Sequence, residues 1–337
     1  MVKIGIIGIG RIGKLHTENI CYNVPRGEVV AIADIYMTDK TIKWAEGLGI
    51  TRCYKDYRKI LQDKDIDGVL ICSSTNTHAP ISLEAIEASK HVFCEKPVDL
   101  EIDKIMEVIN ALEDKNLKYQ VGFNRRFDHN FKAVRDAVNV GRIGDPHIMK
   151  ITSRDPAPPP IDYVKVSGGL FLDMTIHDFD MARYLVNSDV EEVYVQGDVL
   201  IDEEIGKAGD VDTALISMRM ENGTLAVIDN SRKAVYGYDQ RAEVFGSKGM
   251  VSTSNDKPST AMISNEQGII GEKPLYFFLE RYMDSFREEM NCFINAIVND
   301  EPVPVGVYDG LKSVMIGMAA KKSLKEGRPV KISEIKI

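Results

Sequence analysis

The stretch from Val2 to Gly13, VKIGIIGIGRIG, decides the fold of this chain. Its apolar first half is typical of a buried strand and leads directly into the glycine pattern Gly8-Ile9-Gly10-Arg11-Ile12-Gly13. The first glycine permits a tight turn, the second lets the backbone approach a diphosphate, and the third lets a helix pack closely on the strand. The helix that follows points its unpaired N–H groups at that diphosphate. The stretch therefore predicts a dinucleotide site.

The acid that accompanies such a pattern is Asp34, at the end of a second apolar run, Val29–Ala33, about twenty residues after the last glycine. A carboxylate there accepts hydrogen bonds from a ribose 2′-hydroxyl and repels a 2′-phosphate, which predicts NAD rather than NADP as cofactor. No arginine follows, because the next residues are Ile35 and Tyr36. The alternative interpretation is that Asp34 only opens a turn.

Bulk composition narrows the class of protein. A chain of 337 residues, 44% of them hydrophobic, favours two buried cores. Its net charge of −9 and the lack of a basic block argue against nucleic acid or an anionic membrane as partner. Five cysteines without a CxxC pair indicate reduced thiols. With no leader pattern and no apolar stretch long enough for a membrane span, we expect a cytoplasmic protein.

Strands alternate with helical patterns in the first third of the chain, and the helix expected over residues 102–112 is one example. This order predicts an α/β chain whose residues 1–123 form a Rossmann-type, doubly wound parallel sheet that binds NAD. The expected strands are 4–7, 29–33, 68–73, 91–94 and 119–123.

Longer strand-like runs follow a helix expected at 131–140, and they predict a second domain, residues 124–337, for substrate binding and oligomerisation. It is expected to be α+β with an open, mainly antiparallel sheet. Helices are expected at 277–298 and 311–324, and a C-terminal helix near 308–326 is expected to pack back on the first domain. The expected strands are 147–154, 193–200, 213–220, 224–231 and 241–246.

Two short segments carry residues suited to hydride-transfer chemistry. Cys94-Glu95-Lys96-Pro97 stands at the end of the strand expected at 91–94, where the topology places a nicotinamide. Asp173 and His177, four residues apart, would project from one face of a helix, so that the carboxylate holds one imidazole nitrogen. Alternatively, Lys96 is a solvated charge and the Asp–His pair is a surface contact, a cap or half of a metal site. The other histidines lack ligand spacing, and no metal is expected.

The order of these motifs resembles the Gfo/Idh/MocA oxidoreductases over essentially the whole chain. The strings at 123–128, 153–160, 167–185 and 234–241 are similar to one bacterial branch of that family, the inositol 2-dehydrogenases. The resemblance implies NAD-dependent oxidation of a ring hydroxyl. The expected reaction is the oxidation of myo-inositol to 2-keto-myo-inositol. The alternatives are a related dehydrogenase of a pyranose or other polyol, and a non-catalytic NAD-binding regulatory relative.

The resemblance also implies roles for individual residues. Lys96 and His177 flank the reacting hydroxyl, and Asp173 orients the histidine or touches the substrate. His177 suits a general base, and a cation such as Lys96 stabilises a developing alkoxide. A homotetramer formed through the open sheet is a further implication.

Weaker candidates surround these residues. Arg126, Asp155 and Tyr236 could bind ring hydroxyls. Alternatively, Arg126 forms a structural ion pair, Asp155 caps a loop, and Tyr236 packs at the rim of the sheet. Arg11 could reach the diphosphate or lie in solvent. The other expected cofactor contacts, some within what could be an ordinary polar loop, are Ile12, Ser73, Thr75, Asn76, His78 and Glu95.

Overall fold

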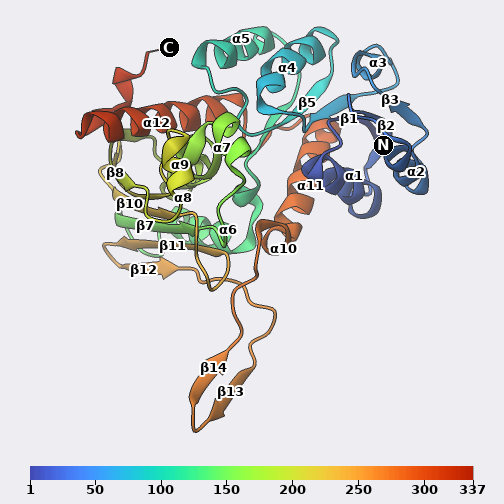
Figure 1. The fold of residues 1–337 in the computed structure, drawn as a ribbon. Coiled ribbons are helices and arrows are strands. Elements are labelled where there is room, and N and C mark those ends of the chain that lie inside the picture. Colours follow the sequence, from blue (N-terminus) through green and yellow to red (C-terminus); the bar gives the residue numbers. More distant parts are fainter. Residues whose placement is uncertain (337) are drawn as a thin grey trace. The chain divides into compact units, whose positions relative to one another are not determined.

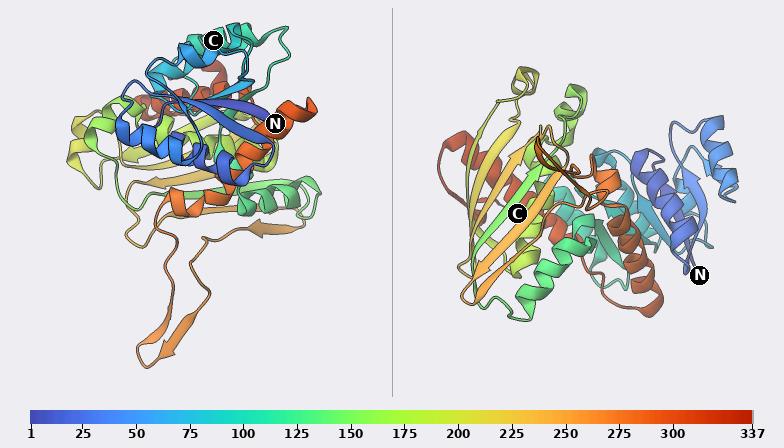
Figure 2. Two further views of the ribbon diagram at one scale, coloured as in Figure 1. Left: turned by 90° about the vertical axis from the view of Figure 1, so that its right-hand side faces the viewer. Right: turned by 90° about the horizontal axis from the view of Figure 1, so that it is seen from below.

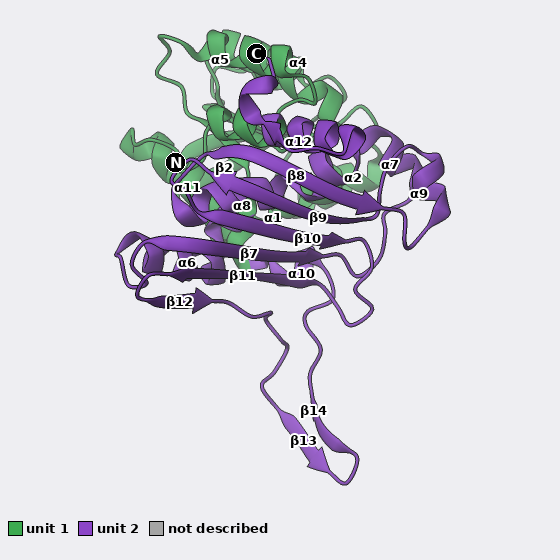
Figure 3. Ribbon diagram, turned by 90° about the vertical axis from the view of Figure 1, so that its left-hand side faces the viewer, with its two compact units in different colours: residues 1–124, 284–314, 337 green, residues 125–283, 315–336 purple. Residues whose placement is uncertain are grey.

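The computed structural model describes residues 1–336 and divides them into two compact units (Figure 3). The first unit contains residues 1–124 and 284–314, and the second contains residues 125–283 and 315–336. Each unit is built around a sheet of its own.

The sheet of the first unit has six parallel strands in the order β3-β2-β1-β4-β5-β6. This order reverses between β1 and β4, which is the doubly wound arrangement expected from the sequence. The strands are β1 (Val2–Ile7), β2 (Gly27–Ala33), β3 (Arg52–Tyr54), β4 (Gly68–Ile71), β5 (His91–Glu95) and β6 (Tyr119–Gly122). The three-residue strand β3 was not expected, because it is too short to show a pattern.

Helices connect and cover these strands (Figure 1). They are α1 (Arg11–Asn23), α2 (Asp39–Gly47), α3 (Arg58–Leu61), α4 (His78–Glu87), α5 (Ile102–Leu112) and, from much later in the chain, α11 (Met283–Asn299). Helix α11 packs Met290, Phe293 and Ile294 into the same core as Ile4 and Phe93. The expectation that residues 124–337 form one domain is therefore wrong for this helix, whose apolar face completes the core of the first unit.

The glycine turn between β1 and α1 has the geometry that its sequence predicts. Gly8 has a φ of +91°, which favours glycine. A Cβ on Gly13 would lie 1.9 Å from the Gly8 carbonyl oxygen, so helix and strand approach too closely for any side chain. A Cβ on Gly10 would meet no atom within 4 Å, which leaves that side of the turn open.

The second unit contains a seven-stranded sheet in the order β12-β11-β7-β10-β9-β8-β15. Only β7 and β10 pair in parallel, and the other neighbours are antiparallel, which confirms the expected open, mainly antiparallel sheet. The strands are β7 (Pro146–Arg154), β8 (Val190–Asp198), β9 (Thr213–Met220), β10 (Leu225–Ser231), β11 (Asp239–Gly246), β12 (Gly249–Ser252) and β15 (Val330–Lys331).

Helices lie behind one face of this sheet, and the face turned toward the viewer in Figure 3 is open. Helix α8 packs against β7, and α6 packs against β11 and β12. The helices of this unit are α6 (His129–Asn139), α7 (Ile161–Ser167), α8 (Ile176–Val186), α9 (Glu203–Lys207), α10 (Phe278–Arg281) and the later part of α12 (Val307–Glu326). Among residues 1–336, no helix is both long and apolar enough to cross a membrane.

A two-stranded hairpin, β13 (Met262–Asn265) and β14 (Gly268–Gly271), extends away from the seven-stranded sheet (Figure 2). All eight of its strand residues are exposed, including Ile263 and Ile269.

The glycine turn generates a prediction about stability. We expect Gly13→Ala to lower the free energy of unfolding by about 1–3 kcal/mol, because the added methyl group overlaps the Gly8 carbonyl. Gly10→Ala, which adds the same group in open space, should change it by less than about 1 kcal/mol. Urea unfolding of both variants measures the difference, and equal stability would contradict the close approach.

Candidate functional site

Asp34 is bonded to the glycine turn. Its Oδ2 accepts a hydrogen bond from the Ile9 N–H at 2.6 Å, and its Oδ1 accepts one from the Tyr36 N–H at 2.8 Å. The second bond is the turn that the alternative interpretation expected, so the carboxylate both shapes that turn and contacts the phosphate-binding motif. A carboxylate has further acceptor positions, which leaves capacity for ribose hydroxyls.

The start of helix α1 suits an anion. Its N-cap residue is Gly10, which has no side chain to cap the first N–H groups of the helix. Arg11 is exposed in the first turn of α1. Since the side of Gly10 is also open, the backbone donors of this turn are accessible to a diphosphate.

The polar loop after β4 is held mainly by its own contacts. The hydroxyl groups of Ser73 and Thr77 lie 2.7 Å apart, and Thr75 and Asn76 belong to a short 3-10 turn. His78 is only 2% exposed, and its two ring nitrogens lie 2.7 Å from the Pro97 carbonyl oxygen and 3.0 Å from that of Ser73. Its ring thus ties this loop to the Lys96–Pro97 segment, a structural role in place of the expected cofactor contact.

The charge of His78 follows from the same contacts. Burial lowers the pKa of His78, but Cys94 and the two backbone carbonyls raise it, to about 9. A doubly protonated ring can donate to both carbonyls at once.

Glu95 and Lys96 stand at the carboxyl end of β5, where doubly wound sheets bind ligands. The Glu95 Oε1 lies 2.9 Å from the His16 Nε2, one turn into helix α1. A Cβ on Gly122 would lie 2.8 Å from the other oxygen of Glu95, so this carboxylate also fills the space over β6. Glu95 therefore joins α1, β5 and β6 directly beside Lys96, which is partly exposed.

A second carboxyl group, Glu289 on α11, belongs to the same region of the first unit. Its side chain is fully buried, and among the described residues neither of its oxygens has a hydrogen-bond partner. Burial, and next the charge of Glu95, raise the pKa of Glu289 well above its usual range. The protonated, neutral form of Glu289 is therefore favoured at pH values where an exposed glutamate is ionised. The sequence analysis missed it, because the residue reads as one acid within an amphipathic helix.

In the second unit, strand register brings two charged side chains together. Strands β7 and β10 are parallel, with Ser153 opposite Asn230, and both of these side chains are buried. The next residues on the same face, one step beyond each strand, are Asp155 and Arg232. The Arg232 Nη1 lies 3.4 Å from the Asp155 Oδ2.

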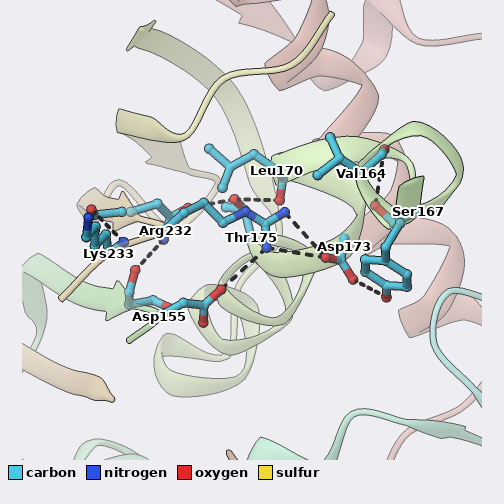
Figure 4. A network of polar contacts seen from close by, with 12 residues as sticks. Asp155, Val164, Ser167, Leu170, Asp173, Thr175, Arg232 and Lys233 are labelled. Carbon is cyan, nitrogen blue, oxygen red and sulfur yellow. Dashed lines mark hydrogen bonds and ion pairs between the residues drawn. The ribbon is translucent and has the colours of Figure 1, made fainter. Parts of the chain in front are cut away.

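Arg232 also contacts Asp173, so one guanidinium bridges two carboxylates (Figure 4). Both of its terminal nitrogens lie 3.3 Å from the Asp173 Oδ2, and the Tyr163 hydroxyl donates to the Asp173 Oδ1 at 2.9 Å. Of the sequence-predicted candidates, Asp155 and Asp173 thus share one cluster. Arg232 and Tyr163 are additional members that the sequence analysis missed.

Asp173 and His177 do not lie on one regular α-helix as expected. Asp173 belongs to a π-helical turn, Leu170–Met174, and His177 is the second residue of α8. The turn begins after Gly168 and Gly169, which both have positive φ angles. The Asp173 carboxylate contacts Tyr163 and Arg232, and its expected role, to orient His177 or to touch the substrate, stays a prediction.

A buried network of hydrogen bonds and an ion pair lies next to this cluster along β10 and α8. Arg125 pairs with Asp178, and the Asn230 amide donates to the same carboxylate at 3.0 Å. The Thr175 hydroxyl then donates to the Asn230 Oδ1 at 2.6 Å. These contacts connect the start of α8 to β10.

Burial raises the pKa of Asp155 to about 6, with Asp173 adding to the rise and Arg232 and Arg125 opposing it. The two guanidinium groups therefore keep a buried carboxylate ionised at neutral pH. This balance of charges suits an acceptor for hydroxyl groups.

Two other candidates form separate contacts. The Arg126 guanidinium makes a bidentate ion pair with the buried Asp180, at 2.8 and 2.6 Å, which is the structural alternative considered for it. The Tyr236 hydroxyl donates to Asp239 at 2.6 Å and accepts from Arg154.

One group of potential metal ligands occurs in the described part of the chain, formed by Asp128, His129 and Asp256. The Arg281 guanidinium contacts both carboxylates, so a protein cation already balances their charge.

A signal in the sequence could have found Arg232 and Asn230. In β10 the side chains that face the covered side are Ala226, Ile228 and Asn230, and Arg232 continues the alternation. Polar residues at inward positions of a strand require buried partners.

Comparison with known proteins adds to this geometry. Residues 2–123 match the family described as an oxidoreductase family with an NAD-binding Rossmann fold. Residues 131–252 match the Gfo/Idh/MocA C-terminal domain. The first match confirms the NAD-binding domain that the glycine turn predicts.

Two relatives are similar over almost their whole length. A protein of Thermotoga maritima named myo-inositol 2-dehydrogenase is 51% identical over 334 residues, which cover 99% of both chains. The inositol 2-dehydrogenase of Rhizobium meliloti is 41% identical over 334 residues, covering 98% of this chain and 99% of the relative.

Solved structures agree with these matches. A probable dehydrogenase from Thermotoga maritima has a TM-score of 0.97 at 51% identity, covering 99% of this chain and 100% of that chain. The scyllo-inositol dehydrogenase of Lactobacillus casei, with bound NAD(H) and scyllo-inositol, has a TM-score of 0.90 at 32% identity and covers 99% of both chains.

The buried Glu289 generates a prediction about pH. Above about pH 4.5, the ordinary pKa of glutamate, the unfolded chain releases this proton while the folded chain keeps it, so folding stability falls as pH rises. Glu289→Gln removes that effect. Its stability relative to wild type should grow by up to about 1.4 kcal/mol per pH unit between roughly pH 5 and pH 8.

Thermal and urea unfolding of wild type and Glu289→Gln, at about pH 5 and about pH 8, measure the difference in stability. The exposed neighbour Glu288 offers a matched control, and Glu288→Gln should show no such trend. A relative stability of Glu289→Gln that is the same at both pH values would contradict a neutral Glu289.

Proposed function

Because the chain belongs to the Gfo/Idh/MocA family of oxidoreductases, we propose that it oxidises a secondary hydroxyl of a cyclitol with NAD, most readily myo-inositol to 2-keto-myo-inositol. The observation that carries this proposal is the likeness, over nearly the whole of both chains, to relatives named inositol 2-dehydrogenases. The cluster of Asp155 and Asp173 supports it, since ionised carboxylates accept hydrogen bonds from ring hydroxyls.

In the proposed reaction, one C–H bond and one O–H bond of the substrate break. The hydride and the proton go to two different acceptors. NAD, held by the glycine turn and Asp34, would supply the acceptor for the hydride of the substrate carbon. His177 accepts the hydroxyl proton as the C=O bond forms, because an imidazole has its pKa near the working pH. Lys96 stabilises the negative charge that develops on the substrate oxygen. Asp173 accepts a hydrogen bond from the substrate.

The cofactor contacts are assigned by motif. The N–H groups at Gly10, Arg11 and Ile12 bind the diphosphate, and Asp34 binds the adenosine ribose, which favours NAD over NADP. The open side of Gly10 and the bond from Ile9 to Asp34 support these roles. Further proposed contacts come from Gly8, Gly13, Ser73, Thr75, Asn76, Glu95 and Lys96.

Among the substrate contacts, Asp155 and Asp173 are proposed here with the support of the cluster, and His177 is proposed from the family resemblance. Roles for Arg126 and Tyr236 stay predictions, because the bonds described for them lead to Asp180, Asp239 and Arg154.

A homotetramer assembled through the open sheet is part of the proposal. Leu215, Leu225 and Phe245 are exposed on this sheet, and the exposed hairpin β13–β14 extends from the same unit. Exposed apolar side chains on an uncovered sheet face are typical of interfaces between subunits. Light scattering of the purified protein tests the assembly, and a monomer would contradict it.

We also propose a cytoplasmic location, with a small polyol as substrate and neither nucleic acid nor membrane as partner. The five cysteines are all free thiols, which is consistent with a reducing compartment. Fractionation of producing cells provides the test, and recovery of the protein outside the cytoplasm would contradict this location.

Initial rates of NAD reduction across a panel of polyols test the proposed activity. We expect myo-inositol to be oxidised faster than scyllo-inositol, chiro-inositol, glucose, xylose and galactose, and faster with NAD than with NADP. A faster pyranose would replace the substrate while keeping the chemistry. Tight NAD binding without turnover on any compound would favour a non-catalytic relative.

The proposed base generates a separate prediction. His177→Ala should lower kcat by about 10²–10⁴-fold, because a positioned general base is lost, and should bind NAD as tightly as the wild-type protein. Steady-state rates and a calorimetric NAD titration measure both quantities. Normal turnover in this variant would remove the base assignment from His177.

A further inference from the structure

Arg232 contacts two residues proposed to bind the substrate, although the proposed chemistry assigns no role to Arg232 itself. Its side chain is only 4% exposed, and it lies between Asp155 and Asp173, two residues proposed to touch the substrate. In Figure 4 the Arg232 guanidinium stands between the two carboxyl groups. The Asp173 carboxylate also accepts the Tyr163 hydroxyl. A buried cation in this place determines where both carboxylates point.

The backbone holds this arrangement from both strands. The Asp155 N–H donates to the Ser231 carbonyl at 2.9 Å, and the Ala234 N–H donates to the Asp155 carbonyl at 2.6 Å. The Arg232 N–H donates to the Asp212 carbonyl at 2.9 Å. The three bonds fix the backbone at Asp155 and Arg232, and the low exposure of the Arg232 side chain leaves its guanidinium little room to turn away.

Arg232 balances the negative charge of several neighbouring carboxylates. Asp155, Asp173 and Asp210 all face Arg232, and its positive charge lowers the pKa of both Asp155 and Asp210. The charge of Arg125 also lowers the pKa of Asp155, and the charge of Lys321, on α12, lowers the pKa of Asp210. Asp210 is also held in place, because both of its oxygens accept the Leu170 N–H.

We propose that Arg232 is a positioning and specificity-determining residue, a proposal that rests on the proposed function. Its guanidinium holds the Asp155 and Asp173 carboxylates as a pair of acceptors for two neighbouring hydroxyls of one polyol ring. A planar guanidinium keeps such a pair in a defined geometry, whereas a lysine ammonium supplies the charge without the fork.

The variants Arg232→Met and Arg232→Lys test this role, with Arg328→Met as a matched control. Arg328 also bridges two carboxylates, those of Glu326 and Glu334, but it is 44% exposed and far from the cluster along the chain. The readouts are kcat and KM for myo-inositol from about pH 5.5 to pH 9, and the dissociation constant of NAD by calorimetry.

We expect Arg232→Met to raise KM for the polyol by about tenfold or more, while the NAD dissociation constant stays within about twofold of wild type. The acidic limb of kcat/KM should move to higher pH, because Asp155 loses the cation that lowers its pKa. Arg232→Lys should raise KM but leave the acidic limb in place, and Arg328→Met should change neither quantity. A folded Arg232→Met variant with the wild-type KM and acidic limb would overturn the proposal.

Should Arg232→Met fail to fold, Arg232→Lys decides the question, since a wild-type KM in that variant shows that the fork is not needed. If wild type oxidises no polyol, the proposed function fails, and the pairing is then tested by stability. The loss of Tm in Arg232→Met should be larger near pH 8 than near pH 5, because a buried, ionised Asp155 has lost its partner. Asp155→Asn should abolish that difference, and an equal loss at both pH values in Arg232→Met would overturn the pairing.

Discussion

Helix α1 can begin directly against strand β1 only because residue 13 has no side chain. A methyl group there would overlap the Gly8 carbonyl, and the helix would have to move away from the sheet. The close approach has two consequences within the first unit. It places the open N-terminus of α1 at the turn that Asp34 also binds, and it sets the helix so that His16, one turn further on, reaches Glu95 beside Lys96. The nucleotide-binding turn and the neighbourhood of the proposed catalytic lysine therefore depend on a single backbone contact.

The second unit depends on buried charge. Its parallel pair of strands, β7 and β10, carries apolar residues inward at first and polar residues at its end, so the core passes into a charged cluster along the same two strands. Arg125 balances Asp178, and Arg232 balances Asp155 and Asp173. Buried ion pairs contribute little net stability compared with apolar packing, but each requires its partner to remain in place. A site built this way is rigid, and it presents carboxylate oxygens in defined positions.

Local patterns predicted the elements well where the pattern is long. The expected helix over 102–112 and the expected strand over 213–220 have the bounds of α5 and β9. The prediction failed where the determining contact is distant or the element is short. Strand β3 has only three residues. Helix α11 was expected in the second domain, because an amphipathic pattern shows that a helix has an apolar face but does not show which core that face joins.

The sequence by itself determined the nucleotide-binding turn, the doubly wound sheet, the cofactor preference expected from Asp34 and the family of the chain, because each of these depends on residues close together in the chain or on recognisable strings. The tertiary structure alone decided which charged groups meet. Arg232 reaches Asp155 only through the register of β7 against β10, Glu95 reaches His16 only through the packing of α1, and Arg126 pairs with Asp180 rather than standing open to a ligand. The physical reason is that charged side chains pair by proximity and burial, and both are set by strand register and helix packing between segments that are far apart in sequence.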